Sequence, residues 1–91
     1  MEEVQIRVQQ TPNPNSLLYH VDRTVTEERM KQFSSAAEAE ADPLAKSLFD
    51  VTGVASVFFM PNSITVSKSA DADWPSVGPA AEEAIRSHFS D

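Results

Sequence analysis

The chain has 91 residues, with 14 acidic and 7 basic residues and a formal net charge of −7. This length allows one hydrophobic core and not two, so we expect a single domain over residues 1–91. The acidic balance and the scattered basic residues make nucleic acid a poor partner and disfavour an anionic membrane, so we expect no nucleic-acid and no membrane partner. The acidic residues either keep the protein soluble or match a basic patch on a protein partner.

Cysteine is absent. The chain therefore has no disulfide, no thiolate metal site and no thiol nucleophile. Residues 1–3 have neither a basic region nor an apolar run, so we expect no signal peptide. No apolar stretch approaches the roughly 18 residues of a membrane helix. We expect a cytoplasmic protein.

The first elements predict a β-hairpin. Apolar and polar residues alternate over residues 4–8 and again over 17–21, which is the period of a half-buried strand. Between them, Thr11–Ser16 reads TPNPNS, and its two prolines fix φ and stop the first strand. The pattern predicts two antiparallel strands joined by a rigid turn.

Residues 22–41 have no clear period. Thr24–Glu27 and Ser35–Glu38 both fit the capping box that begins a helix. Residues 36–41 offer no apolar face wider than alanine, so a short helical turn and a mobile loop both fit. Phe33 is the one large apolar anchor of the segment.

Asp42 followed by Pro43 predicts a helix start, because Asp caps the first turn and proline fits the first helical position. Leu44 to Phe49 place their apolar residues on one stripe, and Gly53 is expected to close the helix.

Residues 54–60 and 63–68 predict a second hairpin around Pro61-Asn62. Residues 54–60 carry apolar side chains on both faces. The strand is therefore either covered on most of both faces or exposed at an apolar edge, and residues 58–60 (Phe-Phe-Met) either pack in the core or form a docking patch.

A polar loop ending in the capping residue Asp73 precedes a last helix that runs to Phe89. Pro79 conflicts with a start at Pro75, because its ring clashes with the carbonyl four residues back. We expect an irregular first turn or a start near Gly78. The element order β-β-α-β-β-α predicts an α+β fold: a two-layer α/β sandwich whose four-stranded, largely antiparallel sheet has its helices on one face.

Few residues suit catalysis. His20 and His88 are the only imidazoles, and neither lies in a recognisable motif. His88 and Asp91 could share a metal ion, but a site needs three or four ligands. No glycine-rich phosphate loop exists. We predict no enzymatic activity, no catalytic residues, no metal site and no cofactor.

The turn at the hairpin tip is the better candidate for binding. Its polar side chains predict contacts to a ligand or peptide at Thr11, Asn13, Asn15 and Ser16; alternatively, the turn only sets strand register. A second candidate pair, Ser34 and Ser35, either contacts a partner or caps a helix.

The segment Thr11–Leu17, TPNPNSL, resembles the opening of the N-terminal domain of Nfu/NifU-type iron–sulfur cluster scaffold proteins. The resemblance continues in order through residues 33–39, 42–45, 48–54, 56–59 and 64–68, and Asp73-Trp74 is similar to the family's lead-in to its last helix. It implies a two-layer fold of the order given above and a role in protein interaction. The family's cluster-binding C-x-x-C pair belongs to a second domain, so no cluster ligand carries over.

We therefore expect a monomeric, non-catalytic protein-interaction module that is accessory to iron–sulfur cluster assembly or delivery. Its partner would be an assembly protein or a client protein. The alternative is a peptide- or anion-binding regulatory domain unrelated to cluster assembly.

Because the chain offers no thiolate, the purified protein should be colourless and should hold no stoichiometric iron. Metal analysis and an absorbance spectrum check this. Iron bound at one atom per chain, held by carboxylates and histidine, would contradict the expectation.

Overall fold

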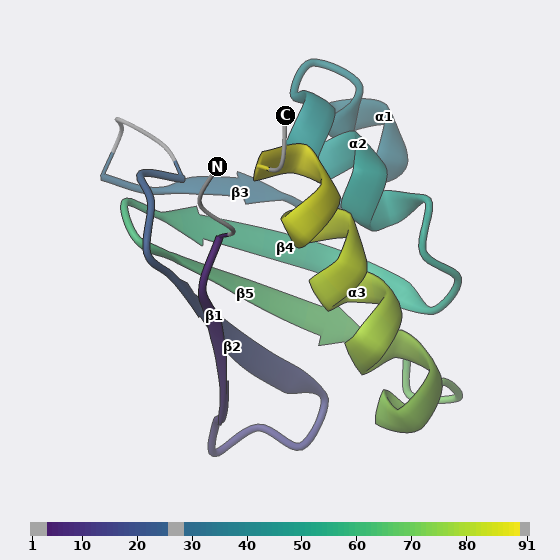
Figure 1. Ribbon diagram of the computed structural model, residues 1–91. Coiled ribbons are helices and arrows are strands. Elements are labelled where there is room, and N and C mark those ends of the chain that lie inside the picture. Colours follow the sequence, from purple (N-terminus) through teal and green to yellow (C-terminus); the bar gives the residue numbers. More distant parts are fainter. Residues whose placement is uncertain (1–3, 26–28, 90–91) are drawn as a thin grey trace.

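A computed structural model of the protein describes residues 4–25 and 29–89 (Figure 1). In chain order the elements are β1 (Ile6–Gln10), β2 (Ser16–Val21), β3 (Lys31–Phe33), α1 (Ala36–Ala39), α2 (Pro43–Phe49), β4 (Val54–Met60), β5 (Ser63–Lys68) and α3 (Trp74–Phe89). No helix in the described ranges is long and apolar enough to cross a membrane.

The strands form one antiparallel sheet in the order β1-β2-β5-β4-β3. Both predicted hairpins are present, and β2 pairs with β5 to join them, with Tyr19 opposite Ile64. The α+β class is confirmed.

The prediction of four strands is wrong, because the sheet has a fifth strand, β3. Phe33 of β3 lies opposite Val57 of β4. Three residues are too few to show the alternation of a strand in the sequence. Strand β3 is therefore recognised only by its pairing with β4. Residues 22–41, which show no clear period, thus hold both a strand and the short helix α1. Of the two alternatives for residues 36–41, the structure has the helical turn.

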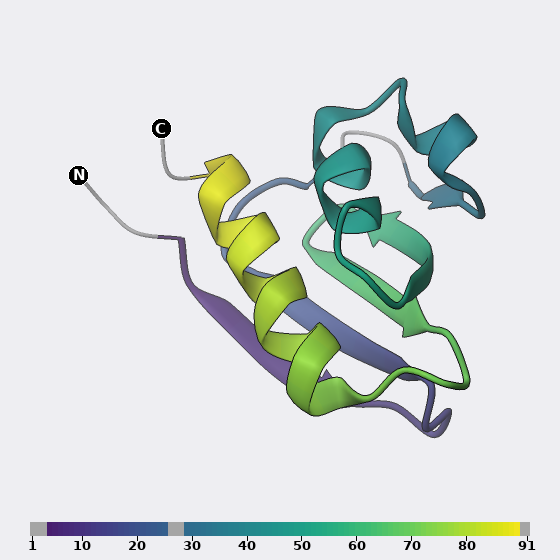
Figure 2. The same ribbon diagram turned by 90° about the vertical axis from the view of Figure 1, so that its right-hand side faces the viewer.

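Register and burial identify the packed face of the sheet. Tyr19, Ile64 and Phe59 lie in one row across β2, β5 and β4, and each is at most 1% exposed. Helices α2 and α3 add Leu48 and Ile85 to the same cluster. Figure 2 shows α3 running alongside the sheet with α2 beside it. The two-layer arrangement with helices on one face stays a prediction.

The apolar run at the end of β4 divides between core and surface. Phe59 is buried and its ring lies 5.5 Å from that of Phe33, centroid to centroid. Phe58 is half-buried and Met60 is 42% exposed. Both alternate with Phe59 along the strand, so they project from the opposite face of the sheet.

Helix α2 begins as predicted. Asp42 Oδ1 accepts the backbone N–H groups of Leu44 at 3.0 Å and Ala45 at 3.2 Å, with Pro43 at the first helical position. The helix ends at Phe49, before Gly53. The C-cap is Asp50, so Gly53, three residues later with φ of 101°, forms the turn into β4 and does not cap the helix.

Helix α3 begins at Trp74, so a start near Gly78 is wrong. Asp73 caps it as predicted: its Oδ1 accepts the N–H of Ser76 at 3.2 Å, and its carbonyl accepts that of Val77 at 2.9 Å. Pro79 lies inside the helix. The cap and the burial of Val77 hold the first turn in place despite the N–H that proline lacks.

The capping box predicted at Thr24–Glu27 reaches residues 26–28, which lie outside the described residues. The loop just before them is tied to the second hairpin, because the Val25 N–H donates to the Pro61 carbonyl at 2.7 Å.

Replacing Gly53 by alanine should destabilise the fold. A Cβ there would lie 2.8 Å from Val77 Cγ2 and 2.9 Å from Ala72 Cβ, at a positive φ that alanine disfavours. We expect Gly53→Ala to lower the free energy of unfolding by roughly 2–4 kcal/mol.

The matched control is Gly78→Ala, whose Cβ would meet no atom closer than 3.9 Å and which lies in a helix. It should be neutral or stabilising by up to about 1 kcal/mol. Urea unfolding of both variants checks the pair, and equal losses at the two sites would contradict the account.

Candidate functional site

The Thr11–Ser16 turn that joins β1 to β2 is closed by its own side chains. Thr11 Oγ1 lies 2.9 Å from the Asn13 carbonyl oxygen and 3.0 Å from that of Ser16, so its proton is donated within the turn. The same oxygen accepts the Asn13 N–H at 3.1 Å. Asn13 Oδ1 accepts the Asn15 N–H at 2.9 Å, and the Ser16 N–H donates to the Asn13 carbonyl at 3.0 Å. The turn is therefore rigid.

Strand β5 anchors the same turn from the side. Lys68 Nζ donates to Asn15 Oδ1 at 3.0 Å, and the Lys68 N–H donates to the Asn15 carbonyl at 2.8 Å. The Ser16 and Ser67 hydroxyl oxygens lie 2.8 Å apart. All four candidate side chains of the turn thus have structural hydrogen bonds, either within the turn or to β5.

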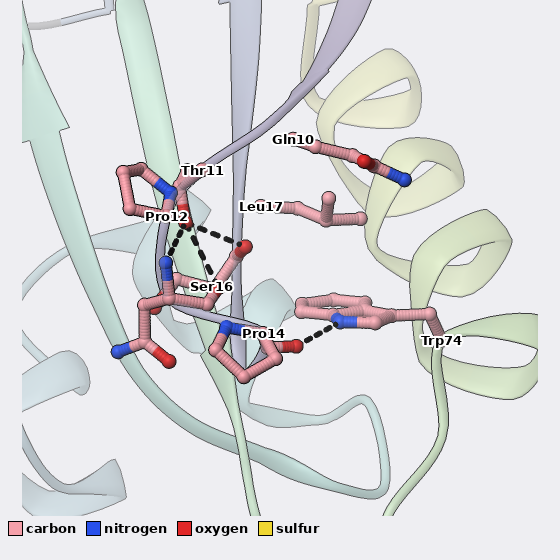
Figure 3. A pocket seen from close by; sticks show the side chains of 8 residues that line it. Gln10, Thr11, Pro12, Pro14, Ser16, Leu17 and Trp74 are labelled. Atoms are coloured by element: carbon pink, nitrogen blue, oxygen red, sulfur yellow. Dashed lines mark hydrogen bonds between the residues drawn. The ribbon is translucent and has the colours of Figure 1, made fainter.

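Trp74, at the start of α3, is the residue that sequence reasoning missed. Its indole Nε1 donates to the Pro14 carbonyl at 2.9 Å, and Figure 3 shows the ring reaching across to the turn. Lys68 Nζ lies 6.0 Å from the indole centroid, within cation–π range. The sequence does contain one indication of this contact. It has a single tryptophan, and the indole N–H of a tryptophan that packs against the protein needs a hydrogen-bond acceptor.

A cleft of about 310 Å³ lies between the turn and α3 (Figure 3). It is lined by Gln10, Thr11, Pro12, Asn13, Pro14, Ser16, Leu17 and Trp74. Pro12 and Pro14 are exposed, whereas Leu17 and Trp74 are half-buried. This mixture of stiff apolar rings and carbonyl groups suits a peptide or protein surface better than a small charged ligand.

The second candidate pair caps α1. Ser35 Oγ accepts the Glu38 N–H at 3.3 Å, and Glu38 Oε1 accepts the Ser34 N–H at 3.4 Å. Both serines are exposed. They follow β3, the edge strand opposite β1, with β5 and β4 between β2 and β3. The structure therefore does not bring Ser34 and Ser35 to the turn.

The histidines have surface roles in the described parts of the chain. His20 Nε2 lies 2.8 Å from Gln9 Oε1, beside a shallow pocket that Arg7 and Asp22 also line. The His88 ring packs edge-on against Phe89 at 4.9 Å. Within residues 4–25 and 29–89, no three His, Cys, Asp or Glu side chains group to hold a metal ion.

A second hollow adjoins the cleft through Leu17. Its floor includes Tyr19, which is fully buried and donates its hydroxyl proton to the Gly78 carbonyl at 3.0 Å. Burial, helped by the nearby Glu82 carboxylate, raises the pKa of Tyr19 to about 12.

Comparison with known proteins places this fold. The family model for the N-terminal region of the scaffold protein Nfu/NifU matches residues 6–91. The human protein named NFU1 iron-sulfur cluster scaffold homolog, mitochondrial, is 42% identical over 86 residues, which cover 93% of this chain and 34% of that protein. The Arabidopsis thaliana NifU-like protein 4, mitochondrial, is 36% identical over 85 residues, covering 93% of this chain and 30% of that protein.

The chain thus spans about a third of the length of these curated relatives. Among solved structures, a NifU-like protein from Saccharomyces cerevisiae aligns with a TM-score of 0.81 at 19% identity, covering 97% of this chain and 80% of that one. A Staphylococcus aureus protein aligns with a TM-score of 0.79 at 24% identity, covering 92% and 99%. At these identities the structures support the fold alone. Both curated relatives are named as mitochondrial, so the cytoplasmic expectation is not confirmed.

The raised pKa of Tyr19 predicts a loss of stability at high pH. Below about pH 10 the phenol is protonated in both states, so stability is unaffected. Between about pH 10 and the folded pKa of about 12, only the unfolded state ionises, and stability should fall by roughly 2–3 kcal/mol.

Tyr19→Phe is the control, since it lacks the ionisable hydroxyl. It should be less stable by about 1 kcal/mol at neutral pH because the bond to the Gly78 carbonyl is gone. The difference in the free energy of unfolding between the two proteins should shrink above pH 10. Only the parent is destabilised there by ionisation of Tyr19, because all other groups titrate alike in both proteins. Unfolding curves that stay parallel to pH 12 would rule out the shift.

Proposed function

We propose that this chain, which belongs to the Nfu/NifU N-terminal family, is a non-catalytic protein-interaction module accessory to iron–sulfur cluster assembly or delivery. The observation that carries the proposal is the match of 93% of the chain to a relative named as an iron–sulfur cluster scaffold. These 91 residues contain no cysteine and so offer no thiolate to a cluster. The contribution that we propose for them is recognition of another protein.

The binding surface in this proposal is the Thr11–Ser16 turn together with Trp74. The turn keeps its shape through its own hydrogen bonds and through Lys68 and Trp74. A preorganised surface loses little conformational entropy on binding, so contacts made there contribute more fully to affinity. Asn13, Asn15 and the exposed prolines would meet the partner, and Ser34 and Ser35 would add contacts only with a partner large enough to reach across the sheet.

The partner proposed is a protein that assembles iron–sulfur clusters or receives them. A net charge of −7 supports a basic surface on that partner, because complementary charge speeds encounter. We propose that the chain acts as a monomer, away from membranes and without a nucleic-acid partner.

The test is affinity purification with the immobilised chain, followed by identification and quantification of the captured proteins. The proposal expects enrichment of proteins that build or carry iron–sulfur clusters. Pro12→Arg should reduce their capture by roughly tenfold, because it adds bulk and charge to an exposed part of the turn while removing no hydrogen bond.

Pro61→Arg is the matched control. Pro61 is also an exposed proline in a hairpin turn, but it lies at the opposite end of the sheet, beside the Met60–Ser63 pair. Capture should be unchanged by this variant. Capture without any cluster-related protein would refute the functional role, and equal loss from both variants would refute the surface.

A further inference from the structure

The outer edge of β1 and the hollow beside it form a groove, here called the β1 groove. Its lining residues come from the first hairpin and from α3: Val8, Leu17, Tyr19, Gly78, Pro79, Glu82 and Glu83. Its volume is about 460 Å³. Figure 2 shows β1 at the margin of the sheet with α3 beside it. The groove thus combines an edge strand with a helix wall.

The backbone of β1 presents alternate residues to the outside. The Asp22 N–H donates to the Gln5 carbonyl at 3.1 Å, so Gln5 faces β2. The Val21 N–H instead donates to the Asn62 carbonyl at 2.9 Å, so Val21, which lies opposite Ile6, faces β5. Antiparallel pairing alternates along the ladder. The backbone N–H and C=O groups of Ile6, Val8 and Gln10 therefore point away from the sheet.

This edge has fewer of the features that block strand addition than the other edge of the sheet. Natural edge strands are protected by being short, by lysine, by proline or by bulges. Strand β3, at the other edge, has three residues and begins with Lys31. Strand β1 has five residues, IRVQQ, without proline or lysine, and its pairing with β2 is regular. Its one charged residue, Arg7, alternates with Val8 and so projects from the face of the strand opposite the groove. Val8, in its middle, is 44% exposed.

The wall of the groove is acidic. Glu82 Oε2 lies 3.0 Å from Arg86 Nη2, and Arg86 Nη1 also donates to the Val4 carbonyl at 3.3 Å. Glu83 is exposed, and no ion pair to it is found among the described residues. Pro79 and Glu83 line the same groove, so a basic side chain bound there has a carboxylate to pair with, and the net charge of −7 favours such a ligand.

We propose that the β1 groove binds an extended, basic segment of another protein as an added sixth strand beside β1. Its backbone bonds to Ile6, Val8 and Gln10, as in β-augmentation. On the groove side, one apolar side chain packs against Val8 and Pro79, and a lysine or arginine meets Glu83. The opposite side chains face solvent. The β1 groove adjoins the cleft at the Thr11–Ser16 turn through Leu17, but the inference rests on the β1 backbone and Glu83 and does not depend on the proposed function.

The test uses a blocked peptide, Lys-Thr-Val-Thr-Lys-Thr, titrated into the full chain while amide hydrogen exchange is followed by NMR. Exchange should slow at Ile6, Val8 and Gln10 and stay unchanged at Arg7 and Gln9, whose amides already face β2. A peptide with glutamate in place of both lysines should bind more weakly.

Two variants separate backbone pairing from charge. Val8→Pro removes an outward N–H that an edge strand can lose without unfolding, and it should lower affinity at least roughly tenfold. Val8→Thr keeps the N–H and the branched side chain, and it should bind nearly as well as the parent. Glu83→Lys should weaken the lysine peptide by about two- to fivefold and strengthen the glutamate peptide.

Three results would overturn the proposal. The first is unchanged exchange at Ile6, Val8 and Gln10 when the peptide is in excess. The second is equal affinity for the lysine and glutamate peptides. The third is protection of these amides without peptide that grows with protein concentration, since that would show that a second copy of the chain occupies the edge. Because Glu83 is exposed, Glu83→Lys keeps the test decisive even if Val8→Pro unfolds.

Discussion

The pairing of β2 with β5 is the contact on which the rest of the structure depends. It joins two hairpins that are far apart in the sequence and places Tyr19 opposite Ile64 at the centre of the core. The same ladder brings the Lys68 N–H to the Asn15 carbonyl and the Ser67 hydroxyl to that of Ser16. Without this pairing the Thr11–Ser16 turn would have no support from β5, and α3 would not be positioned to reach it.

The features that the sequence predicted are those encoded locally. The first hairpin follows from alternation, and the second follows from the strand-forming runs on either side of Pro61-Asn62. Helix α2 follows from Asp42-Pro43 and its apolar stripe. Strand β3 was missed because its only signature is pairing with β4. The bond from Trp74 to Pro14 was missed for the same reason, because sixty positions separate the two residues. Pro79 led to the wrong prediction of a helix start near Gly78, because a proline in a helix clashes with the preceding turn. In the structure, capping by Asp73 and burial of the first turn outweigh that cost.

The structure also changes how the turn is understood. The side chains predicted as contacts for a partner also fasten the turn itself, and those contacts stay a prediction; they are Thr11, Asn13, Asn15 and Ser16. On its outer side, the rigid turn exposes the rings of Pro12 and Pro14. Leu17 lines both the cleft below this turn and the β1 groove. The two surfaces therefore form one continuous edge of the molecule, from the hairpin tip to the acidic side of α3.

The most direct test of this account is an NMR footprint of the chain bound to a purified cluster-assembly or client protein recovered with it. The account predicts that amide signals change along this one edge, at the turn, β1 and the first turns of α3, with the Trp74 indole N–H among them. Changes confined to β3 and α1 would contradict it, because the partner would then be bound at the opposite edge of the sheet.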